Sequence, residues 1–119
     1  MDEYQRTGLD FRALYESLGF SRKDTAFYLK LFDPELVERK TAGTMPILEE
    51  EWAALDRLAK ARDLKVDAVL DASRGQQEIE LLYRTGHRWK DHYHNKVAEL
   101  IAWVLAAEGV TVRLKPTGK

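Results

Sequence analysis

The sequence contains no cysteine, and this absence excludes both disulfide bonds and thiolate metal sites. Long apolar runs are lacking as well, because no segment approaches the ~20 residues that a membrane-spanning helix needs. The first residues, Met1–Arg6, are polar and have none of the apolar core of a signal peptide. We therefore expect a cytoplasmic protein of 119 residues that does not associate with membranes.

Net charge and catalytic motifs are also scarce. The 19 basic and 20 acidic side chains give a formal net charge of −1, so no overall positive field attracts nucleic acid. Any DNA binding must therefore come from a local basic face. The chain has no glycine-rich phosphate loop and no serine in a nucleophile elbow, and its many carboxylates fall at helix caps and on helix faces. We expect neither an enzyme nor a bound cofactor.

Capping signals and helical spacing predict two short helices at the start of the chain. Thr7 can cap a first helix and Gly19 can end it, and between them apolar residues recur with helical spacing. Ser21 followed three residues later by Asp24 is close to a capping box and predicts a second helix through about Lys30. This second helix is expected to bury Ala26, Phe27 and Leu29.

A proline starts each of the next two predicted helices. Asp33-Pro34 places a cap before a proline at the first helical position, and Gly43 is expected to stop this third helix. The residues it is expected to bury are Leu36 and Val37, with the aliphatic stem of Lys40 as a further candidate. Pro46 opens a fourth helical pattern, which continues to about Ser73 either as one helix or as two helices broken near Asp63.

After Gly75 the periodicity changes to that of strands. Alternation over Ile79–Tyr83 and again over Val110–Lys115 predicts two strands, with an apolar helix between them that ends at Gly109. This order implies a parallel pair, and Thr85–Asn95 is expected to be a polar, aromatic loop. The expected fold class is α+β and mostly α, with a bundle of four to five helices in residues 1–73 followed by a small β-α-β unit in residues 76–115.

A two-stranded sheet is marginal on its own, so the C-terminal unit needs further cover. Its own helices could supply this cover, or the same unit from a second chain, in which Trp103 is a candidate interface anchor. We therefore expect a homodimer, with binding of a different protein through this unit as the alternative. The expected interface residues are Tyr83, Trp103 and Val112.

The three histidines lie together in the predicted loop. His87, His92 and His94, with Asp91 nearby, could offer nitrogen and oxygen ligands to a metal. A zinc site needs three or four ligands in defined geometry, and a polar loop whose rings pack back on the sheet is the commoner arrangement. We expect no metal site.

The stretch Leu18–Pro46, LGFSRKDTAFYLKLFDPELVERKTAGTMP, has the outline of a helix-turn-helix, in which two short helices are joined by a tight turn. Its residues LGFSRKDTAFYL…LVER…G…P resemble the lambda-repressor/Cro-like (XRE) helix-turn-helix family over roughly residues 8–60. In that family a small residue, here Ala26, lets the helices approach closely, and an inward aliphatic, here Val37, anchors the second helix of the motif. Lys30 stands in the turn, where the family often has glycine.

The resemblance implies sequence-specific binding of double-stranded DNA by a dimeric repressor on a palindromic operator. The order of the two units is similar to that of short phage and mobile-element regulators such as anti-CRISPR-associated repressors. Arg22 and Lys23 would hold phosphates. The third helix would present Arg39, Lys40 and the carboxylates of Glu35 and Glu38 to base edges. The expected DNA-binding residues are Arg22, Lys23, Asp33, Glu35, Glu38, Arg39, Lys40 and Thr44.

The alternative is a protein of another class. Residues 9–43 contain six bases and six acids, and such a balance argues for modest DNA affinity from one subunit. Glu35 and Glu38 would then be a solvated face of a small bundle. The helix-turn-helix frame would in that case serve as a protein-interaction module that no longer binds DNA.

Overall fold

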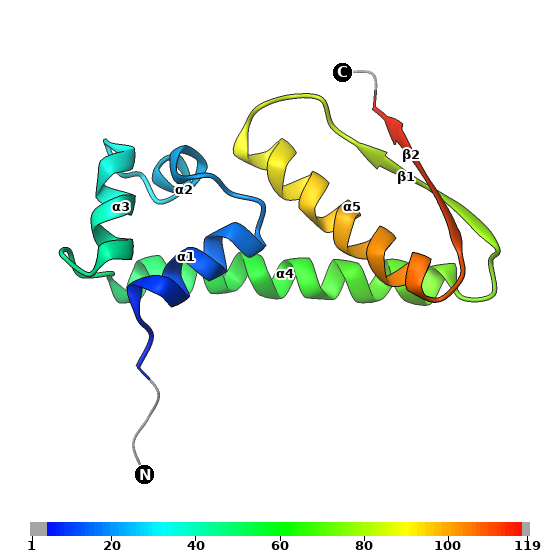
Figure 1. Ribbon diagram of the computed structural model, residues 1–119, viewed down its shortest axis with the longest axis horizontal. Coiled ribbons are helices and arrows are strands. Elements are labelled where there is room, and N and C mark those ends of the chain that lie inside the picture. Colours follow the sequence, from blue (N-terminus) through cyan, green and yellow to red (C-terminus); the bar gives the residue numbers. More distant parts are fainter. Residues whose placement is uncertain (1–4, 118–119) are drawn as a thin grey trace, which may run out of the picture. The chain divides into compact units, whose positions relative to one another are not determined.

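The computed structural model describes residues 5–117 and has the expected class, a mostly helical α+β fold (Figure 1). Within this described part of the chain, four helices precede a β-α-β segment. The elements are α1 (Gly8–Ser17), α2 (Arg22–Tyr28), α3 (Pro34–Ala42), α4 (Glu49–Ser73), β1 (Glu78–Tyr83), α5 (Trp89–Ala107) and β2 (Thr111–Pro116). None of these helices is long and apolar enough to span a membrane.

Three helices begin where their capping residues were expected to place them. The Thr7 hydroxyl accepts from the backbone N–H of Asp10, whose carboxylate accepts from the Thr7 N–H in return. Ser21 and Asp24 make the same reciprocal pair at the start of α2. Asp33 caps α3, with proline at the first helical position. These predictions are confirmed, because each start is decided by residues close together in sequence.

Helix α4 is one continuous helix, which excludes the alternative of two helices, and it begins at Glu49 rather than at Pro46. The backbone N–H of Leu48 donates to the Glu51 carboxylate at 2.9 Å, so a side chain of the first turn of α4 satisfies the N–H just before the helix. The Pro46 carbonyl instead accepts from the Lys40 ammonium at 2.9 Å. That contact holds the proline in the loop before the helix.

The chain divides into two compact units, Met1–Ala59 and Lys60–Lys119, and the division falls inside α4. The sequence suggested a boundary at residues 73–76 instead. The difference has a physical cause, because the two ends of α4 bury their apolar side chains in different cores. Trp52, near its start, meets Phe11 of α1 edge to face at 5.8 Å. Val69 and its apolar neighbours, near its end, pack against α5.

The core of the N-terminal unit is aromatic and aliphatic. Phe11 lies at its centre, with the Tyr15 ring 5.6 Å away and also edge-on. Burial raises the pKa of the Tyr15 phenol above its ordinary value, so the phenol stays neutral at physiological pH. The buried apolar residues of this unit are Phe11, Tyr15, Leu18, Phe20, Ala26, Val37 and Leu55.

The expected burial on α2 is wrong for Phe27. Ala26 is buried and Leu29 is half-buried, but the Phe27 side chain is 73% exposed. Thr25 and Ala26 define the inward face of this short helix, and the next residue lies about 100° further round it. The prediction was wrong because it rested on the apolar character of Phe27 and not on its position around the helix.

Gly8 marks a close approach between α1 and α3. A Cβ atom at this position would lie 2.0 Å from the backbone carbonyl oxygen of Thr41. Real Cβ atoms do not come so close to another atom, so any side chain at residue 8 would force the two helices apart. Glycine is thus what lets the first turn of α1 rest on the last turn of α3.

In the C-terminal unit, β1 and β2 pair in parallel, as expected (Figure 1). The register sets Ile79 opposite Val112 and Leu81 opposite Leu114. Apolar side chains of both strands and of the end of α4 pack against a buried cluster on α5. The cluster consists of Val97, Ile101 and Leu105.

Helix α5 begins earlier than expected, because Trp89–Asn95 is helical and not part of a loop. The side chain of Asn95 accepts from the Arg84 N–H at 2.7 Å and donates to the Arg84 carbonyl at 2.8 Å. His94 Nε2 lies 2.8 Å from the Leu82 carbonyl oxygen. The polar residues of this segment therefore bond to the end of β1. Within residues 5–117, no three or more His, Asp or Glu side chains are disposed to hold a metal ion.

Each strand of the sheet has an edge that no other strand pairs with in the described residues. On β2 the side chains of Arg113 and Lys115 are exposed. Arg113 forms an ion pair with Glu78 of β1. Pro116, which has no N–H to donate, ends the strand. Strand β2 therefore carries two exposed basic side chains and ends in a proline.

Candidate nucleic-acid interface

Helices α2 and α3 pack against each other, and a tight turn joins them. The Leu31 N–H donates to the Ala26 carbonyl at 2.8 Å, and the Lys30 N–H donates to the Phe27 carbonyl at 3.2 Å. These two bonds form a Schellman motif at the end of α2. Lys30 has φ 61° and is the one non-glycine residue with positive φ in residues 5–117. It thus holds the left-handed conformation that glycine usually takes.

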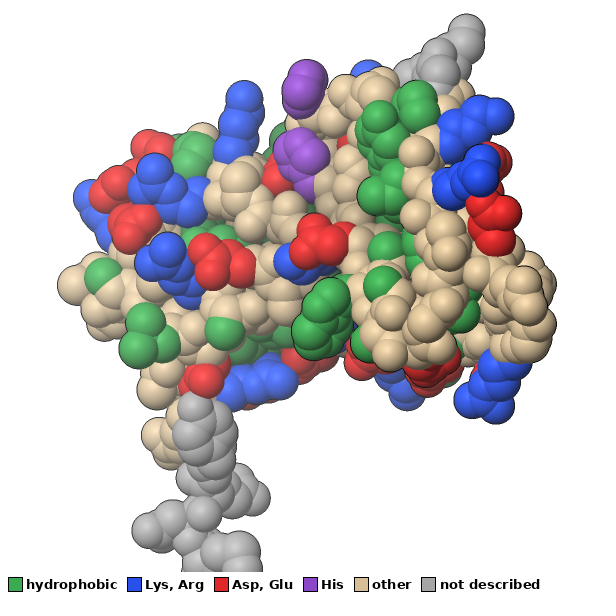
Figure 2. Space-filling view, turned by 45° about the vertical axis from the view of Figure 1, so that its right-hand side comes forward, with side chains coloured by type: hydrophobic (Ala, Val, Ile, Leu, Met, Phe, Trp, Pro, Cys, Tyr) green, Lys and Arg blue, Asp and Glu red, His purple; other side chains and the backbone are tan. Residues whose placement is uncertain are grey.

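Three exposed basic side chains of this helix pair make no hydrogen bond or ion pair with any other described residue. They are Lys23, Lys30 and Arg39. The single acid of residues 22–32, Asp24, is buried and caps the start of α2. Over the face of the molecule that Figure 2 shows, basic and acidic side chains are interspersed. The exposed surface of α2 and its turn is therefore a local basic face on a nearly neutral chain.

Two of the expected DNA contacts bond to each other. Arg22 of α2 forms an ion pair with Glu38 of α3, with 2.8 Å between guanidinium and carboxylate. About half of each side chain is exposed, so this pair is screened by solvent and contributes little to stability. It fastens α2 to α3 on the outside. The contact uses one guanidinium nitrogen and one carboxylate oxygen, so the other N–H groups of Arg22 and the second oxygen of Glu38 stay available to a ligand.

Two other expected contacts serve the ends of α3. The Asp33 carboxylate accepts from the Glu35 N–H at 2.9 Å, which caps the start of the helix. The Thr44 hydroxyl donates to the Arg39 carbonyl at 3.2 Å, beyond the left-handed Gly43 that ends it. Glu35 and Arg39 are exposed. Of the expected contacts on α3, these two side chains are thus the ones that face solvent.

Lys40 is a correction, because its side chain is 3% exposed and cannot reach a ligand outside the fold. Its ammonium donates to the Glu51 carboxylate at 2.8 Å and to the Pro46 carbonyl at 2.9 Å. Glu51 also accepts from the Leu48 N–H at 2.9 Å. The sequence predicted burial of the Lys40 stem as a possibility but assigned its charge to DNA, because no local signal marks its partner eleven residues away. A buried charge is kept only where such a partner neutralises it.

Sequence reasoning also missed the aromatic residues of this surface. Phe32, in the turn before the Asp33 cap, is 91% exposed, and Phe27 is 73% exposed. No local signal indicated the exposure of Phe32, because an apolar residue just before a cap commonly packs against the fourth residue of the helix. We call the exposed residues Arg22, Lys23, Phe27, Lys30 and Phe32 the basic–aromatic surface.

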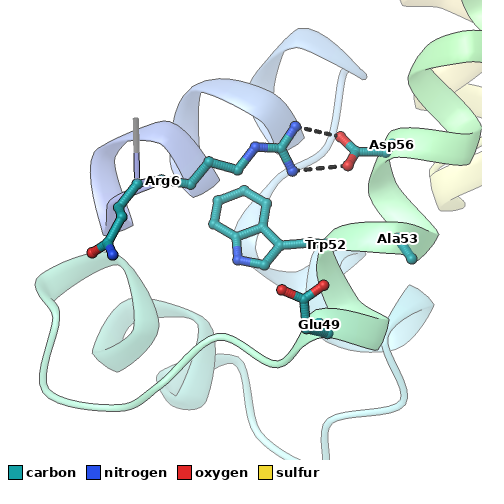
Figure 3. Close-up of a pocket in the computed structure, with 6 residues that line it drawn as sticks. Arg6, Glu49, Trp52, Ala53 and Asp56 are labelled. Carbon is teal, nitrogen blue, oxygen red and sulfur yellow. Dashed lines mark hydrogen bonds and ion pairs between the residues drawn. The ribbon is translucent and has the colours of Figure 1, made fainter. Parts of the chain in front are cut away.

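A pocket of about 520 Å³ elsewhere in the N-terminal unit is lined by Arg6, Trp52 and Asp56, among others (Figure 3). Both terminal nitrogens of Arg6 bond to the Asp56 carboxylate, at 2.8 and 2.9 Å. These bonds raise the pKa of Arg6. The guanidinium also lies 4.5 Å from the centre of the Trp52 ring. Through these contacts with Asp56 and Trp52, Arg6 fastens the segment before α1 to α4.

The C-terminal unit has an apolar groove of about 450 Å³ between α5 and the sheet. Of the expected interface residues, Tyr83 and Trp103 line it together with Leu114, and Trp103 is 76% exposed. The third expected interface residue, Val112, is half-buried, packs against the internal cluster on α5 and does not line the groove. Figure 2 shows hydrophobic side chains at the surface of this unit.

Comparisons with known proteins do not assign the chain to a family. A scan against protein-family models gave no match, and a search of curated proteins gave none either.

Proposed function

We propose that the protein is a sequence-specific DNA-binding regulator in which α2 and α3 form a helix-turn-helix. Helix α3 would enter the major groove, and α2 would lie across the backbone. The observation that carries the proposal is the local basic face. The side chains of Lys23 and Lys30 on this face, and of Arg39 on α3, are exposed and make no hydrogen bond or ion pair with the other described residues, although the chain as a whole is almost neutral. Such a face binds a polyanion without a strong overall field.

We propose further that the regulator acts as a homodimeric repressor on a palindromic operator. Few phosphate contacts from one subunit give weak binding, and a second subunit doubles them at a fixed spacing. The groove of the C-terminal unit, with Trp103 exposed at its rim, would provide the contact between copies. Tryptophan is among the residues that most often anchor interfaces.

The test is selection of duplexes from a random pool by the full chain, followed by titration of the preferred and a scrambled duplex at matched salt. Arg39→Ala should weaken binding to the preferred duplex by about tenfold and change the scrambled duplex less, as for a lost base contact. Lys23→Ala should weaken both alike and reduce the salt slope by about one. Lys65→Ala, an exposed lysine of the C-terminal unit, is the matched control and should change neither.

Enrichment of no sequence, together with no binding to any duplex, would contradict the proposal. The interaction-module alternative would then take its place. If the parent binds DNA but Arg39→Ala leaves the preference unchanged, DNA binding stands and the assignment of α3 to base contacts fails.

A further inference from the structure

Phe32 is the most exposed of the large hydrophobic residues of the described chain, at 91%. Its position is fixed on both sides. Lys30 precedes it in the Schellman turn, and Asp33 follows it as the cap of α3. A phenylalanine ring in water forfeits the free energy that burial would give it. The fold offers the ring no cover of its own, so any burial must come from a ligand.

The charges around the ring indicate what kind of ligand fits. Across residues 22–32 the exposed charges are all basic, since Asp24 is buried in its capping role. Asp33, next to the ring, caps the start of α3, where its carboxylate accepts from the Glu35 N–H. An apolar protein partner would have to meet these cations unpaired. Duplex DNA presents phosphates to the cations and, in the major groove, the thymine methyl as an apolar group.

We propose that Phe32 contacts a thymine C5-methyl group and so determines one position of the preferred DNA sequence. The proposal rests on the proposed function and adds a specific determinant to it. The ring stands beside the start of α3, which would enter the groove. Lys30 of the basic–aromatic surface would lie nearby to bind a phosphate. This contact needs no hydrogen-bonding side chain, so it would let a chain with an acidic α3 discriminate A·T pairs.

The experiment removes the methyl from the DNA instead of changing the protein. In the duplex selected by the full chain, each thymine is replaced singly by deoxyuridine, and affinity is measured by fluorescence anisotropy at fixed salt. One replacement should weaken parental binding by about fourfold, which corresponds to about 0.8 kcal/mol for one buried methyl group. Phe32→Ala should bind the unmodified duplex at least that much more weakly and should be insensitive to the same replacement. Leu9→Ala, an equally apolar change at a 73% exposed site on α1, is the control and should respond as the parent does.

Three outcomes overturn the inference, and they are distinguishable. If Phe32→Ala retains the full sensitivity to every replacement, the ring touches no thymine methyl. If Phe32→Ala binds DNA as the parent does but changes the sedimentation of the protein, the ring is a protein contact. If the parent itself selects no duplex, the proposed function fails first, and the inference fails with it.

Discussion

Lys30 adopts a backbone conformation that residues other than glycine seldom take. It closes the turn after α2 at φ 61°, with both hydrogen bonds of the Schellman motif formed. A residue with a Cβ atom loses about 1 kcal/mol there relative to glycine. The lysine thus destabilises the turn while adding an exposed cation to the basic–aromatic surface. Local rules are most often broken in this way where a residue has a task other than stability.

Replacing Lys30 by glycine should stabilise the protein and weaken DNA binding. The free energy of unfolding should rise by up to about 1 kcal/mol, because relief of strain outweighs the greater freedom of glycine in the unfolded chain. Urea denaturation followed by circular dichroism measures this change. Affinity for a random duplex should fall, because one phosphate contact is lost.

The matched control for this change is Gly43→Ala. Gly43 has φ 83°, and a Cβ atom there would meet nothing within 4 Å, so only backbone strain is added. That variant should lose about 1 kcal/mol. A Lys30→Gly variant less stable than the parent would mean that the lysine side chain stabilises the turn by contacts of its own.

At the scale of the elements, the end of α3 is fixed to the start of α4 by the buried pair of Lys40 and Glu51. Their side chains are 3% and 7% exposed, and each also bonds to the backbone of the connecting loop. A charge buried this deeply is tolerated only with its partner. The position of α3, and with it any DNA contact by this helix, therefore depends on the buried pair of Lys40 and Glu51.

Removing one member of this pair should destabilise the protein far more than removing both. Glu51→Leu leaves the Lys40 ammonium buried and uncompensated, so the free energy of unfolding should fall by about 3–5 kcal/mol. Combining it with Lys40→Met should recover most of that loss, as apolar replacements of buried pairs usually do. A double-mutant cycle in urea gives the coupling. Equal losses in the single and double variants would show that the ammonium is hydrated after all.

The sequence predicted those elements whose signals are local. Thr7, Ser21 and Asp33 each cap a helix through bonds to residues two or three positions later, so their roles follow from spacing alone. The start of α5 was missed because its polar first turns are held by bonds to the end of β1. Lys40 was misplaced for the same reason, since its partner belongs to another helix. Which residues of the candidate site are exposed is therefore a tertiary property.

At the scale of the whole molecule, the proposed dimer depends on Trp103. Trp103→Ala should convert the protein from a dimer of twice 13.8 kDa to a monomer at low micromolar concentration, as measured by sedimentation equilibrium. The reason is that the exposed indole is the largest apolar side chain at the rim of the groove, and such residues anchor interfaces.

Phe27→Ala is the control for this prediction, because it removes an aromatic ring of similar exposure from the N-terminal unit. It should leave the dimer intact. A parent protein that sediments as a monomer would remove the paired half-site arrangement. A dimer that survives Trp103→Ala would place the contact between copies on another surface.

The outer edge of β2 has a consequence for the behaviour of the protein at high concentration. An unpaired strand edge is a template on which further chains stack into cross-β fibrils. Here Arg113 and Lys115 would stand next to their own copies in such a stack, and Pro116 would interrupt its hydrogen bonds. We therefore expect the sheet, which has two strands in the described residues and carries exposed apolar side chains, to resist growth into fibrils from this side.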